Sequence, residues 1–204
     1  MTLLSFVVIP MLRNTPQSWG SVSKTFHWLI AALIVVQVPA GYLMSYTYGL
    51  AMHDSAVQPL QDLASQFHHT IGLLILVLVP ARLAWRFSGP VPGGVGEGLP
   101  GVRLLARVCH GLLYALLMVL ALSGWAAVSV VAGAPIWLFG ARDVVPRILP
   151  AQPAQAWLGY WLFGHIHIYA VWLGAGVLAA HAGAAVWHLA VVKDGVFRRM
   201  WPLG

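Results

Sequence analysis

The stretch that decides the fold is FGHIHIYAVWLGAGVLAAHAGAAVWHLAVV, residues 163–192. It contains no Lys, Arg, Asp or Glu, and a helix of this length crosses the hydrocarbon layer of a bilayer, which is about 30 Å thick. His167 and His181 lie fourteen residues apart within it. Because fourteen residues make nearly four helical turns, both rings leave the same face, about 21 Å apart along the axis. Ionisable residues inside a membrane are rare and usually functional.

The composition indicates a protein whose solvent is mostly lipid. Of the 204 residues, 60% are hydrophobic and 8% are charged, whereas a soluble domain carries about a quarter charged residues. The net charge is +6, but the cations lie between apolar segments and not in a basic patch among stacking aromatics, so we expect no nucleic-acid partner. The single cysteine, Cys109, excludes an internal disulfide, a cysteine-ligated iron–sulfur cluster and the CxxCH attachment of a c-type haem.

Four apolar segments are long enough to span a membrane, which predicts an all-α integral membrane four-helix bundle. We expect the spans near Thr25–Met44, Phe67–Phe87, Val108–Val131 and Phe163–Val192. Prolines and glycines, among them Pro59 and Pro100, fall in the connections and are expected to break helices there. We expect residues 1–20 to be an N-terminal tail and residues 21–204 to be one transmembrane domain.

The positions of Lys and Arg predict the orientation of this bundle. Nine of the eleven lie in the N-terminal segment, the second connection and the C-terminus. Only Arg142 and Arg147 lie in the other two connections. The positive-inside rule therefore places both termini in the cytoplasm. Arg142 and Arg147 would then face outward, either to attract an anion such as superoxide or as ordinary solvated loop charges.

This orientation sorts the histidines by depth. His27, at the start of the first span, lies near the cytoplasmic face, and His68, at the start of the second, lies near the outer face. On the last span His167 is outer and His181 is inner, so the pairs are His27 with His181 and His68 with His167. Since adjacent helical residues point about 100° apart, only one of His68 and the following histidine, His69, can face a shared partner, and spacing leaves that choice open.

Two histidine pairs at two depths predict two haem groups, each held by two axial imidazoles. A small metal ion would need all of its ligands in one coordination sphere, and these pairs are about 21 Å apart along the last helix. Such irons have no open position, so they should transfer electrons and not bind oxygen. Gly174, midway between His167 and His181, would leave room for the haem edges, or is a plain helix contact; Gly72, Gly111 and Gly124 are candidates for similar clearance. Arg82 would pair with a haem propionate, or anchor the helix end.

The sequence resembles the bacterial cytochrome b-561 family, which is related to nickel-hydrogenase-type cytochrome b subunits. The resemblance covers roughly residues 20–202 and is carried by Ser23-Lys24-Thr25-Phe26-His27-Trp28, His68-His69-Thr70-Ile71-Gly72, the stretch from Arg82 to Arg86, His110, His167, His181 and Lys193-Asp194. It selects His68 over His69 and implies two non-covalent haem b groups with bis-histidine iron and a quinone as substrate. It also implies a multi-pass protein of the bacterial inner membrane, in or beside the respiratory chain.

These observations lead to one main functional expectation and two alternatives. We expect an oxidoreductase that passes single electrons between an outer-face donor, with superoxide as a candidate, and the quinone pool. The first alternative is a membrane anchor subunit for a partner redox enzyme such as a hydrogenase. The second is a non-haem membrane transporter, against which all five acidic residues lie outside the predicted spans, where ion-coupled carriers commonly place carboxylates inside. The oligomeric state stays open.

Overall fold

The chain forms a bundle of four long helices. The structure, a computed structural model, describes residues 11–93 and 100–202. The long helices are α1 (Ser21–Ala51), α2 (Gln58–Phe87), α3 (Pro100–Ser129) and α4 (Tyr160–Trp187), and a short 3-10 helix, η1 (Ser55–Val57), joins the first two. All four are long and apolar enough to cross a membrane. The predicted all-α membrane four-helix bundle is therefore confirmed.

The helices extend further than the hydrophobic segments predict. α1 runs beyond the predicted span at both ends, and α2 begins at Gln58 instead of near Phe67. The expectation that Pro59 and Pro100 break helices is wrong, because Pro59 lies in the first turn of α2 and Pro100 is the first residue of α3. Proline suits the first turn of a helix, where its missing N–H costs no hydrogen bond. At a rise of about 1.5 Å per residue, each helix is longer than the hydrocarbon layer is thick, which is about 30 Å.

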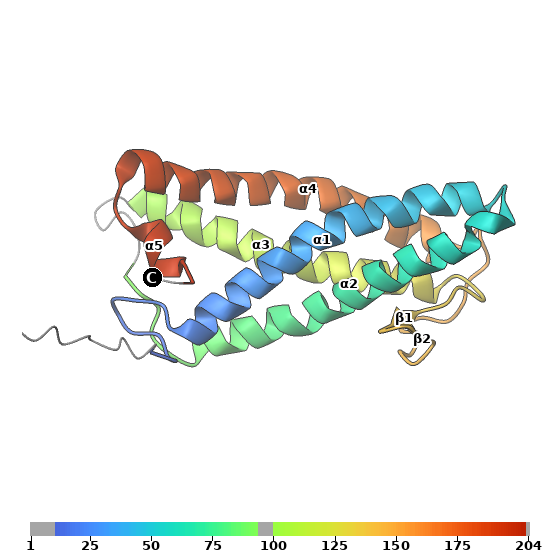
Figure 1. Cartoon of the computed structure of the whole chain (residues 1–204), viewed down its shortest axis with the longest axis horizontal. Helices are drawn as coiled ribbons and strands as arrows, with labels where there is room; N and C mark the ends of the chain where they lie inside the picture. The colour runs from blue at the N-terminus through green and yellow to red at the C-terminus, as the bar shows by residue number, and fades with distance from the viewer. Residues whose placement is uncertain (1–10, 94–99, 203–204) are drawn as a thin grey trace, which may run out of the picture.

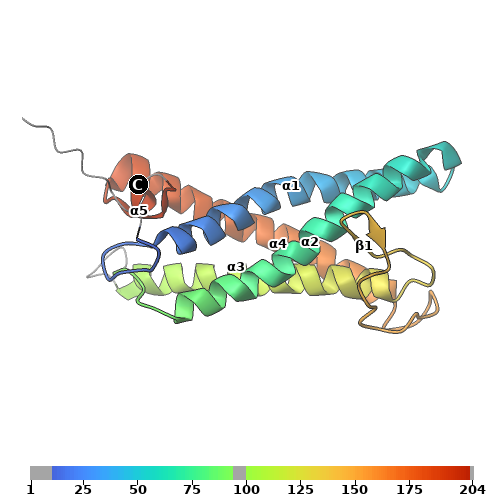
Figure 2. The same ribbon diagram turned by 60° about the horizontal axis from the view of Figure 1, so that its bottom comes forward.

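The four helices pack as two hairpins. α1 lies along α2, α3 lies along α4, and α2 joins the two hairpins through α3 (Figures 1 and 2). A small core between α1, α2 and α3 contains the buried side chains of Ile30, Ile71, Ile75 and Val79. Most other large apolar side chains point outward, and Ala170 is the only buried residue of α4. A molecular surface with so many exposed apolar side chains suits contact with lipid and not with water.

A two-stranded ribbon lies at the end of the bundle where α1 meets α2 (Figure 1). Strands β1 (Trp137–Leu138) and β2 (Ala141–Arg142) pair antiparallel. The ribbon docks on α2, because the Trp137 N–H donates to His69 Nδ1 at 3.4 Å and the Phe139 N–H donates to Thr70 Oγ1 at 3.0 Å. Nothing in the hydrophobic pattern predicts these strands.

Arg147 closes the C-terminal end of α3 at this same end of the bundle. Its Nη1 donates to the carbonyls of Val128, Ser129 and Val131 at 2.9–3.0 Å, and its Nη2 donates to Ala134 O at 2.5 Å. Two of these carbonyls, those of Val128 and Val131, also accept the backbone N–H groups of Val131 and Ala134 at 3.3 Å. The guanidinium adds a charged donor to all four carbonyls where the helix ends. Arg142 is exposed, and its guanidinium lies 5.3 Å from the centre of the Trp137 ring. The two arginines of this connection therefore have different roles.

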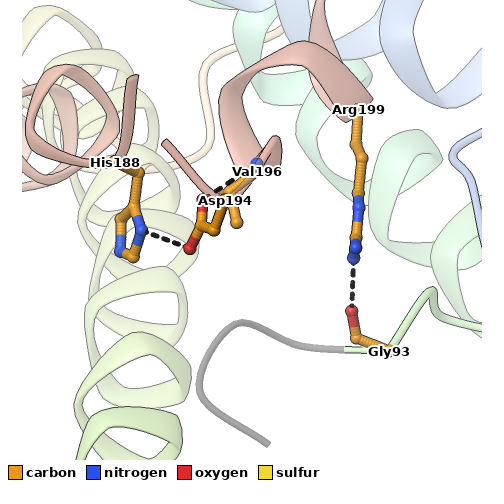
Figure 3. Close-up of polar contacts among 5 residues, drawn as sticks. All are labelled: Gly93, His188, Asp194, Val196 and Arg199. Atoms are coloured by element: carbon orange, nitrogen blue, oxygen red, sulfur yellow. Dashed lines mark hydrogen bonds and ion pairs between the residues drawn. The ribbon is translucent and has the colours of Figure 1, made fainter. Parts of the chain in front are cut away.

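At the opposite end, a turn folds the chain back under the bundle. α4 continues into a π-helix, η2 (His188–Val192), and the short helix α5 (Val196–Met200) follows. His188 Nδ1 lies 2.7 Å from Asp194 Oδ2, and Asp194 Oδ1 accepts the Val196 N–H at 3.1 Å (Figure 3). Arg199 Nη1 donates to the Gly93 carbonyl at 3.0 Å, in the same view. These contacts hold α5 against the bundle.

The expected N-terminal tail, residues 1–20, lies partly outside the described residues. Residues 11–20 form a loop at the same end of the bundle as α5 (Figure 1). The Asn14 side chain is buried, and its Oδ1 accepts the Gly20 N–H at 3.0 Å and the Ser23 hydroxyl at 2.6 Å. This loop therefore caps the start of α1.

Candidate functional site: two histidine pairs

Two pairs of imidazole rings face each other across the bundle. His27 of α1 and His181 of α4 have ring centroids 6.2 Å apart, with their planes at 73°. His68 of α2 and His167 of α4 have centroids 6.1 Å apart, with their planes at 78°. Each pair joins the α1–α2 hairpin to α4, whose backbone packs mainly on α3. The structure therefore brings together the same pairs that depth in the membrane predicts.

One face of α4 carries both of its paired histidines. His167, Gly174 and His181 are half-buried, and the buried Ala170 lies among them, whereas His165 is exposed. The His165 Nδ1–H donates to Trp161 O at 2.6 Å, within its own helix. His165 is thus turned away from the bundle interior.

In the His68–His167 pair, each ring is packed against a glycine of a third helix. A Cβ added at Gly41 of α1 would lie 2.7 Å from His68 Cε1, and one added at Gly124 of α3 would lie 3.1 Å from His167 Cε1. A side chain at Gly41 would force the His68 ring to shift, and one at Gly124 would require the His167 ring to give by a few tenths of an ångström. The sequence suggested clearance at Gly124 but gave no signal for Gly41.

The hydrogen bonds around His167 and His68 differ. The His167 Nδ1–H donates to Leu120 O at 2.9 Å, with Ser123 Oγ at 3.3 Å. Beside His68, the amide of Gln37 donates to the His68 backbone carbonyl at 3.0 Å. Leu120, Ser123 and Gln37 were not predicted, because each depends on how two helices cross.

The structure gives His68 and His69 separate surroundings. His68 faces His167, whereas His69 Nδ1 accepts the Trp137 N–H of the ribbon at 3.4 Å. The spacing of the sequence leaves these two residues as equal candidates for the pair. Their contacts place His68 in the site and give His69 a role in holding the ribbon on α2.

The His27–His181 pair has two further basic neighbours. The His110 ring of α3 has its centroid 5.1 Å from that of His181, and its Nδ1–H donates to Ala106 O at 2.6 Å. Arg82 lies over the Tyr114 ring at 5.6 Å and is close enough to His27 and His181 to act on both electrostatically. Within the described residues, no carboxylate forms an ion pair with Arg82.

The predicted clearance glycines have different surroundings. A Cβ at Gly174 would meet only Leu120 Cδ1, at the ordinary contact distance of 3.8 Å. One at Gly72 would lie 3.3 Å from Gln37 Nε2, and one at Gly111 would meet no described atom within 4 Å. Of these positions, Gly174 alone lies between the two histidines of α4 on their shared face.

A four-helix membrane bundle with histidines paired across its interior is the architecture of a membrane cytochrome. The sequence model described as "Prokaryotic cytochrome b561" matches residues 18–203. "Cytochrome b561 homolog 2" of Escherichia coli (strain K12) is 32% identical over 187 residues, covering 92% of this chain and 93% of that protein. "Probable superoxide oxidase CybB" of Yersinia pestis is 27% identical over 176 residues, covering 86% of this chain and 91% of that protein.

The chain belongs to the prokaryotic cytochrome b561 family. It is therefore a multi-pass bacterial membrane protein of the class that binds haem b and transfers electrons. This membership confirms the resemblance that the histidine motifs suggested. It also argues against the alternative of a non-haem membrane transporter, because this family binds haem b.

The residues present fit haem b on three observations. Two imidazoles that bind one metal from opposite sides by bonds of about 2 Å have centroids about 6 Å apart, which the separations of 6.2 and 6.1 Å match. The 5.1 Å between His110 and His181 is too short for that arrangement. In each pair one buried ring nitrogen, Nδ1 of His27 and Nδ1 of His68, has no hydrogen-bond partner in the described part of the chain. Arg82 supplies a cation that has no carboxylate partner among the described residues.

Proposed function

We propose that the chain holds two haem b groups, one between His27 and His181 and the other between His68 and His167. The observation that carries this proposal is the near-equal ring separation in the two pairs, 6.2 and 6.1 Å. Because His167 and His181 are fourteen residues apart on one face of α4, the two groups lie at two depths, about 21 Å apart along the helix. That arrangement carries electrons across the membrane.

Several side chains have defined roles in this proposal. The bond from His167 Nδ1 to Leu120 O leaves Nε2 for the iron and fixes the ring, as metal-ligating histidines require. Arg82 neutralises a propionate at the inner site, since a half-buried cation calls for an anion. Gly174 leaves space on α4 between the two groups. When bound, each bis-histidine haem supplies one-electron chemistry with no open iron position.

The proposed reaction moves electrons between an outer-face donor and the quinone pool. Superoxide is the proposed donor: each anion loses one electron and leaves as O₂, and a quinone takes up two electrons and two protons to become a quinol. The name of the Yersinia pestis relative supports this donor, as does the exposed Arg142 at the ribbon end. The cation asymmetry of the sequence supports cytoplasmic termini in the inner membrane.

The pairing is tested by haem counts on purified double variants. His27→Ala/His181→Ala removes both ligands of one site and should retain one haem per chain. His27→Ala/His68→Ala removes one ligand from each site and should retain none with bis-histidine, low-spin bands. Equal haem content in the two double variants would contradict the pairing. Separately, superoxide that fails to reduce a protein that quinol does reduce would contradict the proposed donor.

A further inference from the structure

Trp137 of the ribbon carries a buried hydrogen-bond donor that has no acceptor. The residue is 6% exposed, and its indole Nε1–H has no hydrogen-bond partner in the described part of the chain. The indoles of Trp28 and Trp125 instead donate to the carbonyls of Met200 and Pro146, at 2.8 and 3.0 Å. A buried N–H without an acceptor is costly, so the Trp137 indole calls for an acceptor from outside the described chain.

The contacts of Trp137 connect this donor to the His68–His167 pair. The Trp137 backbone N–H donates to His69 Nδ1 at 3.4 Å, and the His69 ring centroid lies 6.5 Å from that of His68. Strand β1, which contains Trp137, packs on α2, and the ribbon lies at the end of the bundle where α2 begins (Figure 1). One imidazole ring therefore separates the Trp137 backbone from a proposed iron ligand.

The buried atoms without partners gather at the two histidine pairs. Besides Trp137 Nε1, the described residues include three of them: His27 Nδ1, Gln37 Oε1 and His68 Nδ1. Two of the three are ring nitrogens of paired histidines, and the Gln37 amide donates to the His68 backbone carbonyl at 3.0 Å. Since these three lie where we propose the haem groups, the same explanation covers the Trp137 donor: its acceptor belongs to a bound haem.

The charge beside Trp137 favours an anionic acceptor. Of the two arginines at this end, Arg147 donates to four carbonyls, whereas the Arg142 guanidinium lies 5.3 Å from the centre of the Trp137 ring. The carboxylate of the same connection, Asp143, accepts the Ile136 N–H at 3.1 Å. A cation next to a buried N–H favours an acceptor that carries negative charge.

We propose that the Trp137 Nε1–H donates a hydrogen bond to a propionate carboxylate of the haem b held by His68 and His167, with Arg142 supplying positive charge nearby. This inference rests on the proposed ligation by those two histidines. Haem b carries two carboxylates, and a carboxylate in the interior needs donors or a cation. Arg82 has this role in the His27–His181 site, and Trp137 is the corresponding donor in the His68–His167 site.

This hydrogen bond raises the reduction potential of the His68–His167 haem. A carboxylate next to the porphyrin stabilises the positive charge of ferric iron. A donor that binds the carboxylate weakens this effect and so favours the ferrous form. Without the donor, the full charge of the carboxylate acts on the iron, and the potential falls.

The test is a redox titration of the full-length protein in detergent, with Trp137→Phe beside the unchanged chain. Phe keeps an aromatic ring and removes the N–H, so the His68–His167 haem should shift to a lower potential while the other haem stays unchanged. Trp125→Phe is the matched control, because the Trp125 indole at the same end already donates to Pro146 O; it should leave both potentials unchanged. Equal shifts in the two variants, or none in Trp137→Phe, would overturn the role of Trp137.

A haem with neutral side chains separates the hydrogen bond from an effect of packing. The protein is reconstituted with haem b dimethyl ester, and the potential difference between Trp137→Phe and the unchanged chain should shrink, because hydrogen bonds to ionised acceptors are roughly twice as strong as neutral ones. A difference of the same size would assign the effect to packing of the ribbon. A difference that instead follows the chloride concentration would assign the donor to a free anion. Either result overturns the proposal.

Ultraviolet resonance Raman spectra of the unchanged chain answer the same question if Trp137→Phe does not fold. The spectrum of protein loaded with haem b, minus that of protein loaded with the dimethyl ester, isolates an indole whose N–H contacts the carboxylate. We expect a band of a more strongly hydrogen-bonded indole in the haem b form. No difference between the two spectra would overturn the contact.

The variant His68→Ala separates this proposal from the proposed ligation. It should lose the haem whose potential shifts in Trp137→Phe, measured by haem count and redox titration. If His68→Ala retains both haems, the ligation fails, and the acceptor assigned to Trp137 fails with it. If His68→Ala loses one haem while Trp137→Phe leaves both potentials unchanged, the ligation stands and only the role of Trp137 is overturned.

Discussion

The His68 and His167 rings lie 6.1 Å apart between α2 and α4, and each is packed against a glycine of a third helix, Gly41 of α1 and Gly124 of α3. All four long helices therefore meet at this one ring pair. A site assembled in this way depends on the whole bundle. Small changes on α1 or α3, which supply no histidine to this pair, should still disturb it.

Replacing His68 and His69 one at a time should give opposite results for haem content. His68→Ala should lose one of the two haems, because it removes half of a pair, whereas His69→Ala should retain both. His69 instead accepts the Trp137 N–H, so its loss should loosen the ribbon and lower thermal stability. The haem-to-protein ratio from a pyridine haemochrome assay distinguishes the two. Loss of a haem from His69→Ala with full retention by His68→Ala would reverse the assignment.

Gly41→Ala should impair the outer site. The added methyl would lie 2.7 Å from His68 Cε1, and such overpacking costs about 1–3 kcal/mol. We expect a lower melting temperature and partial loss of one haem. Gly176→Ala is the control on α4, since a Cβ there meets no described atom within 4 Å. Equal effects of the two substitutions would show that the contact with His68 is unimportant.

Replacing Arg147 and replacing Arg142 should affect different properties: the first should lower stability, and the second should slow the reaction with the donor. Arg147→Gln removes a cation that binds four carbonyls near the end of α3, and should cost about 1–2 kcal/mol of stability. Arg142→Gln should leave stability unchanged and slow reduction by superoxide at low ionic strength, with the difference shrinking as salt is added. Thermal melts and stopped-flow reduction measure the two effects. If Arg142→Gln leaves the rate unchanged at low salt, Arg142 does not steer the donor.

The docking of α5 should weaken in acid. Burial raises the pKa of Asp194, but hydrogen bonds from the Val196 N–H and from His188, with the charge of His188, outweigh it and hold that pKa below its ordinary value. A depressed folded-state pKa gives stabilisation that is full above the ordinary value of about 3.9 and is lost as the pH falls through the folded-state value. The protection of the backbone amides of residues 196–200 against hydrogen exchange, measured relative to their intrinsic rates at each pH, should therefore fall below about pH 4.

Two variants control this acid effect. Asp194→Asn should exchange faster at neutral pH and lose the acid dependence. Arg199→Gln breaks the separate bond to Gly93 O, and should speed exchange while retaining the acid dependence. Acid-dependent exchange that persists unchanged in Asp194→Asn would assign the effect to another group.

Helical periodicity and charge asymmetry predicted the part of the site that lies within single helices. The fourteen residues between His167 and His181 fix a shared face whatever the neighbouring helices do. The positive-inside rule then gave each histidine a depth, and depth gave the same pairs that the structure brings together.

The remainder depends on contacts between helices, which no local pattern encodes. Gln37 meets His68 and Gly41 meets the same ring because α1 crosses α2 at one particular height. The role of His69 depends on a ribbon that lies 68 residues further along the chain. The helix starts were missed for a local reason, because Pro59 in a first turn looks the same in sequence as a proline that breaks a helix.

The most direct test of the central claim is the haem-to-protein ratio of the purified protein, with a reduced-minus-oxidised visible spectrum. Two bis-histidine sites predict two haem b groups per chain, both with low-spin bands. A ratio of one, or a high-spin component that binds carbon monoxide, would contradict the account, because one histidine pair would then not hold an iron from both sides.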